Sequence, residues 1–268
     1  MNNEFPLRGL EFWKELEGKR HHDLPLIIQR GLARRTINAV VLLAETMKDD
    51  NEDMDIRKIL FKRLNTGGVQ LNPQELRNAL YPSAFNELIT ELSRHDLFTE
   101  AWGIPKRTDD EEENPSALLL KNTLFKSMAD CELILRFFGI KRLITMQLGG
   151  SLRSILDKTA KAYQFSSNSE LMSLRKSFEE SITGLSEIFG ESLFIMPSTG
   201  KLSRPLYDAF MVAYSLVDKD KITSSETIIN KLSSISSDSI SYDILTGKGN
   251  TTESIKDRIE LAKSILTA

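Results

Sequence analysis

The stretch FKRLNTGGVQLNPQELRNALY, residues 61–81, places two adjacent glycines between two segments of helical character. The second segment carries local signals of a helix start. Asn72 is a good N-cap, Pro73 suits the first helical position, and Glu75 completes a capping box. Either glycine supplies the left-handed residue that ends the preceding helix. The stretch therefore predicts a helical hairpin with a double-glycine connector.

Several polar residues of this hairpin are not explained by its geometry. Gln74, Arg77 and Asn78 fall on one stripe of the second helix, together with Tyr81. An arginine with amides beside an open backbone is able to hold a phosphate or a base edge. The alternative is a hydrogen-bonded surface that locks the connector to its neighbour, and the residues leave both interpretations open. No Walker A spacing occurs, so a standard phosphate-binding loop is excluded.

Composition is that of an ordinary globular chain. Its 268 residues are 40% hydrophobic and 27% charged, with a net charge of −3. Any nucleic-acid contact must therefore come from a local basic patch. The single cysteine, Cys131, excludes an internal disulfide framework and a cysteine-rich zinc site. With three histidines and no third ligand at useful spacing, no metal site and no cofactor are predicted from the residues.

The pattern along the chain predicts three regions. Residues 36–45 form an apolar run that favours a buried strand, although a buried helix stays open. Residues 105–115 contain five consecutive acidic residues between prolines, which is typical of a solvated loop, and we interpret them as a linker. Apolar residues recur at helical spacing beyond it. The predicted organisation is a mixed α/β domain at 1–104 and a helical domain at 116–268.

A basic cluster stands out near the start of this otherwise acidic chain. Arg30 and Arg34 lie one helical turn apart and share a face. A continuous patch there is able to follow a phosphate backbone, and a solvated face paired with nearby carboxylates is the alternative. The cluster consists of Lys19, Arg20, Arg30, Arg34 and Arg35. In the apolar run around residue 136, Arg136 is expected to pair with Glu132, four residues earlier.

The stretch at residues 60–80, LFKRLNTGGVQLNPQELRNAL, resembles a signature of the GmrSD-type restriction domain family, bacterial proteins with a ParB- and sulfiredoxin-like nuclease fold. The segments FPLRGLEFWKELEGKRHHDLP, DCELILRFFGI and LSRPLYDAFMVAY are similar to other parts of that family. The resemblance implies a mainly α fold, with a small mixed α/β N-terminal remnant of a ParB-like domain followed by a helical bundle. It also implies a polar site in this domain. The residues that line or support that site by resemblance are Arg63, Asn65, Thr66, Gly67, Gly68, Gln74, Glu75, Arg77 and Asn78.

Two family features are missing from the sequence. The upstream glutamine-rich motif associated with nucleotide hydrolysis and DNA restriction is absent, and no histidine follows His95 to serve an HNH nuclease module. We therefore expect the chain to start inside the family's N-terminal domain and not to be catalytic alone. The resemblance allows a nucleotide with Mg²⁺ as cofactor in a full-length form.

Two functional hypotheses follow. The first is a component of a bacterial modification-dependent restriction or antiviral defence protein that recognises nucleic acid or nucleotide, with DNA as partner. The second is a non-catalytic helical interaction subunit, or a truncated relative, that binds a partner protein. An incomplete sheet presents unpaired backbone groups, so self-association or partner binding through the N-terminal flank is expected. No apolar run approaches a membrane span, and the cytoplasm is the expected compartment.

Overall fold

The computed structural model describes residues 5–10, 12–34, 71–109, 111, 114–235, 238–246 and 251–267. Most of these residues lie in helices, so the mainly helical fold class is confirmed. The predicted strand at residues 36–45 and the double glycine lie outside the described residues, and the ParB-like remnant stays a prediction. The chain divides into two compact units, Met1–Ile56 and Arg57–Ala268.

The first unit contains short helical elements. They are the 3-10 helices η1 (Lys14–Leu16) and η2 (His21–Asp23) and the α-helix α1 (Leu26–Ala33). The 3-10 helix η1 begins directly after Trp13, which adopts a left-handed backbone conformation with φ 57°. A backbone pairing encloses η1, since Leu7 N–H donates to Lys19 O at 2.9 Å and Gly18 N–H donates to Leu7 O at 2.8 Å.

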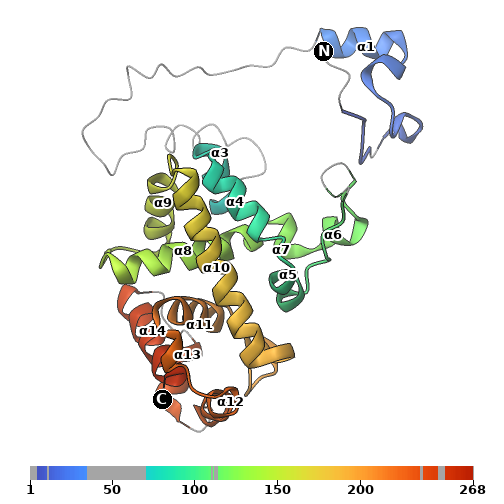
Figure 1. The fold of residues 1–268 in the computed structure, drawn as a ribbon. Coiled ribbons are helices and arrows are strands. Elements are labelled where there is room, and N and C mark those ends of the chain that lie inside the picture. The colour runs from blue at the N-terminus through green and yellow to red at the C-terminus, as the bar shows by residue number, and fades with distance from the viewer. Residues whose placement is uncertain are drawn as a thin grey trace. The chain divides into compact units, whose positions relative to one another are not determined.

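The second unit is built from helices with one small hairpin (Figure 1). Its helices are α3 (Pro73–Leu80), α4 (Ala84–Leu92), α5 (Asp96–Trp102), α6 (Ala117–Lys121), α7 (Thr123–Lys126), α8 (Ala129–Thr145), α9 (Leu152–Ala162), α10 (Asn168–Phe189), η5 (Gly190–Ser192), α11 (Arg204–Leu216), η6 (Lys219–Lys221), α12 (Ser225–Ser234), α13 (Ser239–Thr246) and α14 (Thr252–Leu266). The hairpin pairs β1 (Ile195–Met196) antiparallel with β2 (Lys201–Leu202).

Local sequence signals explain where the helices of the second unit begin and end. The Ser151 side chain accepts the Ser154 N–H and caps the start of α9. Gly190 ends α10 with φ 52°, a conformation that favours glycine. Pro205 occupies the first turn of α11, where its missing N–H costs nothing.

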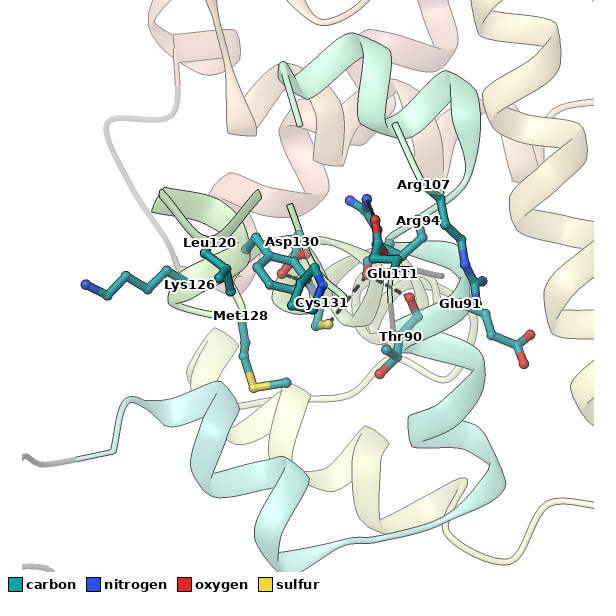
Figure 2. Close-up of a pocket in the computed structure, with 13 residues that line it drawn as sticks. Thr90, Glu91, Arg94, Arg107, Glu111, Leu120, Lys126, Met128, Asp130 and Cys131 are labelled. Atoms are coloured by element: carbon teal, nitrogen blue, oxygen red, sulfur yellow. Dashed lines mark hydrogen bonds and ion pairs between the residues drawn. The ribbon is translucent and has the colours of Figure 1, made fainter. Parts of the chain in front are cut away.

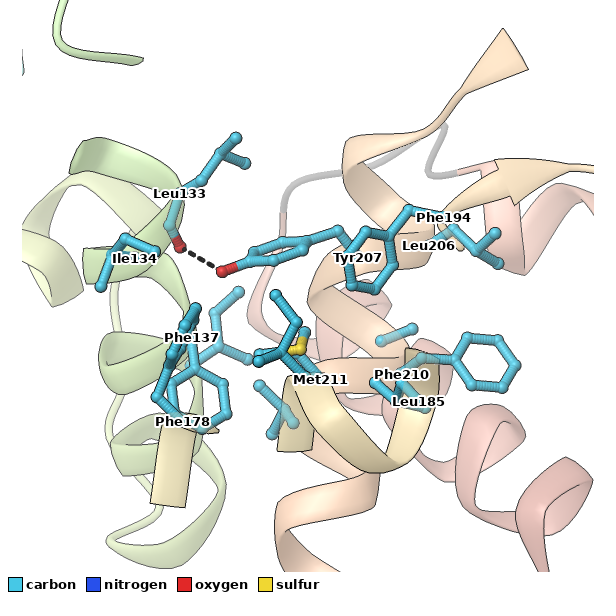
Figure 3. Packing of buried hydrophobic residues seen from close by; sticks show 14 of the residues in the cluster. Leu133, Ile134, Phe137, Phe178, Leu185, Phe194, Leu206, Tyr207, Phe210 and Met211 are labelled. Atoms are coloured by element: carbon cyan, nitrogen blue, oxygen red, sulfur yellow. Dashed lines mark hydrogen bonds between the residues drawn. The ribbon is translucent and has the colours of Figure 1, made fainter. Parts of the chain in front are cut away.

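Helix α8 lies at the centre of the hydrophobic core. It contacts α4, α7, α9 and α11, and its buried residues occur around most of its circumference. Leu133 and Phe137 of α8 meet Phe178 of α10 and the α11 residues Tyr207 and Phe210 (Figure 3). The Tyr207 hydroxyl donates to Leu133 O at 3.0 Å, so the one polar atom of this ring is satisfied inside the core.

The core continues across the segment predicted as a linker. Helices α4 and α5 precede residues 105–115, yet both contact α10, and α4 also contacts α8. Ile89 and Phe98 belong to the same buried cluster as Phe178. In Figure 1, α10 passes alongside this part of the molecule and reaches α12.

The predicted pairing of Arg136 with Glu132 is wrong. Arg136 Nε donates to Asp208 Oδ1 at 3.0 Å, and its Nη2 contacts the second carboxylate oxygen of the same residue. Asp208 lies on α11 and is 1% exposed. A buried carboxylate needs a counter-charge far more than an exposed pair along one helix does, so the packing of α8 on α11 decides the partner. Glu132 contacts Arg77 instead.

None of the helices in the described part of the chain combines the length and hydropathy needed to span a bilayer.

Candidate functional site

The polar stripe of α3 lies against the rest of the helical unit. Gln74 is 2% exposed and Arg77 is 3% exposed, whereas Ala79 on the other side of the helix is exposed. Of the two interpretations that the sequence leaves open, the burial of these two side chains favours a surface that locks α3 to its neighbours. The capping box of Asn72 and Glu75, with Pro73 in the first turn, is confirmed.

Carboxylates from two other helices explain why the polar face of α3 is the buried one. Arg77 Nε donates to Asp157 Oδ1 of α9 at 2.8 Å, and Arg77 Nη1 donates to Glu132 Oε2 of α8 at 3.2 Å. Gln74 Oε1 accepts from the same Nη1 at 3.2 Å, and Gln74 Nε2 donates to Asn78 Oδ1 at 3.1 Å. A guanidinium held by two carboxylates in a buried setting fixes the positions of the helices that supply them.

The other predicted site residues lie either outside the described residues or in the first unit. Arg63, Asn65, Thr66, Gly67, Gly68 and Arg35 lie outside the described residues. Arg30 and Arg34 are exposed on α1 in the first unit, and Arg34 N–H donates to Arg30 O at 3.2 Å, as expected one turn apart. Their role in binding nucleic acid stays a prediction.

A cavity of about 620 Å³ opens beside the start of α8 (Figure 2). Its walls come from the end of α4, the 105–115 segment, the short helices α6 and α7, and the first turn of α8. Leu120, Phe125 and Met128 supply apolar surface. Its size and mostly apolar lining are typical of pockets that hold small molecules. We call it the Arg94 cavity after the charged residue at its wall.

Arg94 is the most constrained charged group of the cavity. It is 6% exposed, and it donates from Nε to Glu111 Oε1 at 2.7 Å and from Nη2 to Glu111 Oε2 at 2.6 Å. Nη2 also donates to Pro105 O at 2.8 Å. The remaining nitrogen, Nη1, is buried and has no acceptor among the residues that the structure describes. Such an orphaned charged donor is uncommon in a folded protein and asks for an explanation.

The ion pair of Arg94 corrects the interpretation of the acidic run. Glu111 was expected on a solvated loop, but only 12% of its side chain is exposed. The guanidinium takes both of its oxygens, and this bidentate geometry is among the strong forms of charged hydrogen bond. The predicted linker is thus fastened to the helical unit at this point.

Asp130 and Cys131 form the first turn of α8 at the wall of the cavity. Burial raises the pKa of the Asp130 carboxyl, although the Cys131 and Asp130 N–H groups and the Arg94 charge act in the opposite direction. Asp130 Oδ1 accepts the Cys131 N–H at 2.8 Å. Burial, followed by the neighbouring Asp130 charge, raises the pKa of the Cys131 thiol to about 12. A thiol with that pKa is a poor nucleophile at neutral pH.

The charged side chains of the cavity balance one another. Three are basic and three are acidic, namely Arg94, Arg107, Lys126, Glu91, Glu111 and Asp130. In Figure 2, Lys126 extends away from the group around Arg94, and the Glu91 carboxylate lies on the opposite side. Only the inner groups, Arg94, Glu111 and Asp130, are buried enough to act at low effective dielectric.

The arrangement offers groups that suit the binding of a ligand. The described residues that line the cavity include no histidine and no tyrosine. Within the described ranges, no three histidine, cysteine, aspartate or glutamate residues gather as a metal site would require. What the site offers is one unsatisfied cationic donor, one desolvated carboxyl and an apolar wall.

Sequence reasoning missed Arg94, Glu111 and Asp130 as a group. Arg94 and Glu111 are 17 positions apart, and no periodic pattern relates them. A signal existed for Asp130, because an acidic residue in the first turn of a long apolar helix is a helix-start feature. That signal predicts a helix terminus and gives no indication of the cavity beside it.

Comparison of the chain with known protein families, with curated proteins and with solved structures found no match. The resemblance to GmrSD-type proteins therefore stays a prediction.

Proposed function

We propose that the chain is a non-catalytic recognition component whose helical unit binds a small molecule in the Arg94 cavity. The observation that supports this most is the buried Nη1 of Arg94, which lacks an acceptor within the described part of the chain. An unmet charged donor costs about 1–3 kcal/mol or more, so an arrangement that keeps one beside a cavity is best explained by a ligand that meets it. The apolar wall and the volume fit the same purpose.

The proposal retains part of the first hypothesis from the sequence and changes its location. Recognition moves from the α3 stripe, where Arg77 is held by Asp157 and Glu132, to the cavity at the start of α8. The resemblance to restriction proteins supplies the setting, a bacterial defence protein in which this chain senses and another part acts. That setting is part of the proposal and rests on the resemblance alone.

The experiment is an NMR titration of the full chain with three bicyclic probes of similar size. The probes are quinazoline-2,4-dione, its 1,3-dimethyl derivative and 2-naphthoate. At least one of them is expected to shift the amide signals of Thr90 and Cys131, which line the cavity. If all three leave those signals unchanged at millimolar concentration, the proposed function is wrong.

Two matched variants check that binding occurs in this cavity. Leu120→Trp places a large ring at the cavity wall and is expected to abolish the shifts. Leu118→Trp changes an exposed leucine of the same helix that does not line the cavity, and it should leave the titration unchanged. Equal behaviour of the two variants would place the binding elsewhere.

A second candidate function, DNA binding through α1, is favoured by the exposure of both Arg30 and Arg34. Arg34→Ala should weaken binding of duplex DNA and lower the slope of log affinity against log salt by about one. Lys176→Ala, an exposed cation on α10 in the other unit, is the control. Salt-independent binding, or none at low salt, would remove this candidate.

A further inference from the structure

The acceptor that completes Arg94 has to be compatible with the charges already present. Glu111 takes two N–H groups of the guanidinium and balances its charge at 2.6 and 2.7 Å. A second carboxylate at Nη1 would therefore add a negative charge close to Glu111 without a free positive partner. Asp130 adds a further acidic group at the same wall. A neutral acceptor, such as a carbonyl oxygen, avoids this repulsion.

Among the described residues, the Asp130 carboxylate lacks a hydrogen-bond donor from the cavity side, whereas Arg94 Nη1 lacks an acceptor. Its carboxyl group is 2% exposed and receives the Cys131 N–H at 2.8 Å from within its own helix turn. Burial nevertheless leaves the charged form poorly compensated, as the direction of its pKa change indicates. A neutral N–H donor from a ligand would compensate it without bringing in another charge.

The Arg94 guanidinium and the Asp130 carboxyl group lie at the same wall of the cavity. Arg94 and Asp130 both line the cavity, and they lie close enough for the guanidinium charge to act on the carboxyl group (Figure 2). Phe125 lies over the guanidinium, with its ring centre 5.7 Å from the Arg94 Cζ atom. Nη1 is buried in the absence of a ligand, so we infer that a ligand displaces a neighbouring side chain of the wall to reach it, with Phe125 as the nearest aromatic candidate. The Phe125 ring also offers an aromatic surface to a flat ligand.

From this geometry we propose that the ligand is a planar cyclic amide that carries its C=O and N–H on one edge. The C=O accepts from Arg94 Nη1, the N–H donates to the Asp130 carboxylate, and the ring lies against Phe125 and Leu120. Lactams, imides and the edges of several nucleobases belong to this chemical class. The inference rests on the proposed function, because it names the ligand class of the same cavity.

Competing ligand classes satisfy fewer of these groups. An aromatic carboxylate reaches Nη1 but faces Glu111 and Asp130, and it offers no donor. A flat ligand with its N–H groups methylated keeps the carbonyl but leaves the Asp130 carboxylate buried without a donor. Loss of one charged hydrogen bond of this kind lowers affinity by about tenfold or more.

The same three probes test the inference. Quinazoline-2,4-dione carries the required edge and is expected to bind at least about tenfold more tightly than its 1,3-dimethyl derivative or 2-naphthoate. Equal affinity for the dione and its dimethyl derivative would overturn the inference, and so would tighter binding of 2-naphthoate. Either result leaves the proposed function standing, whereas absence of binding by all three contradicts the proposed function itself.

Variants separate the role of Asp130 from a general effect on the cavity. Asp130→Ala should weaken dione binding about tenfold or more and leave 2-naphthoate unchanged or stronger, because a negative charge has been removed. Glu87→Gln is the matched control, since this exposed carboxylate of α4 does not line the cavity, and dione affinity should stay within twofold. Amide spectra without ligand check that each variant is folded.

If Asp130→Ala does not fold, the double variant Arg94→Met with Glu111→Gln provides the second route. It removes the guanidinium and the Glu111 carboxylate that pairs with it, so neither of the two is left without the other. The carbonyl of the dione then lacks its donor, so the affinity for the dione should fall by about tenfold or more. An unchanged affinity would show that other groups bind the carbonyl, and the inference would be wrong.

Discussion

Arg77 and Arg94 are both buried arginines, and they illustrate two ways of using a guanidinium. Arg77 spends its donors on Asp157, Glu132 and Gln74, and it joins three helices. In Arg94, Nε and Nη2 donate to Glu111 and Pro105, whereas Nη1 has no acceptor among the described residues. The first pattern is that of a structural residue, whereas the second is the observation from which we propose a ligand site.

Loss of Arg77 should be costly for stability. Arg77→Met keeps much of the side-chain volume but removes the guanidinium that contacts both Asp157 and Glu132, whose side chains are 17% and 29% exposed. We expect the free energy of unfolding to fall by about 3 kcal/mol, measured by urea denaturation. Arg175→Met, which breaks an exposed pair with Glu91, should change it by less than about 1 kcal/mol. Similar losses for the two variants would contradict the structural role of Arg77.

The thiol of Cys131 should be protected in the folded protein. At pH 8.5 a pKa of about 12 leaves roughly one thiol in three thousand ionised, so a disulfide reagent should react only as fast as the chain opens. Because the folded-state pKa lies above the ordinary value of 9.0, the unfolded chain loses the proton first. Stability should therefore fall as the pH rises from about 9 towards about 12.

Reaction kinetics with and without a low concentration of urea provide the measurement for Cys131. The rate should rise in parallel with the population of the open state. Fast reaction in native buffer, at the rate of an exposed thiol, would contradict the buried position of Cys131.

At the scale of elements, the sequence predicts where a helix starts better than it predicts which face of the helix is buried. The capping box of Asn72 and Glu75 is local, and the sequence places it correctly. The buried face of α3 is decided by Asp157 and Glu132, which are 80 and 55 positions from Arg77. A hydrophobicity pattern assigns polar residues to the surface, so it cannot anticipate a face buried through ion pairs.

The contact between α8 and α9 depends on the absence of a side chain at Gly139. A Cβ there would lie 2.7 Å from Leu156 Cδ2, and Leu156 is itself buried. Gly139→Ala gains about 0.5–1 kcal/mol from better helix propensity but loses about 1–3 kcal/mol from overpacking. We expect a net loss near 1 kcal/mol in the free energy of unfolding.

The control for Gly139 is Gly149→Ala, where an added Cβ would have no neighbour within 4 Å. It should change stability by less than about 0.5 kcal/mol in the same urea titration. If the Gly139→Ala protein is as stable as its parent, α8 and α9 can move apart at little cost. The close approach of the two helices at Gly139 would then contribute little to stability.

At the scale of the molecule, the helices from α4 to α14 share one core. The buried cluster includes Ile89 before the acidic segment and Phe138 and Ile259 after it. The sequence correctly predicts that this part is helical, because the periodicity and caps are local. It predicts a boundary at residues 105–115 because the acidic run looks solvated, and it has no means of showing that Glu111 meets Arg94.

A shared core predicts a shared unfolding event. In hydrogen exchange on the full chain, the slowest amides of α4, α8 and α11 should report opening free energies within about 1 kcal/mol of one another. The reason is that α8 contacts both α4 and α11, so neither can leave without exposing the centre of the core. Separate opening of α4 and α5 at much lower free energy would favour two domains divided at residues 105–115.

The Arg94–Glu111 pair also has a consequence for how this protein can vary. It closes a loop of the chain with a non-covalent tie, and the entropy cost of such a closure grows only with the logarithm of loop length. Doubling the number of residues between the two partners would cost about 0.6 kcal/mol, less than a single good hydrogen bond to a charged group contributes. We therefore expect relatives to differ in length between Pro105 and Glu111 while retaining both ends of the tie.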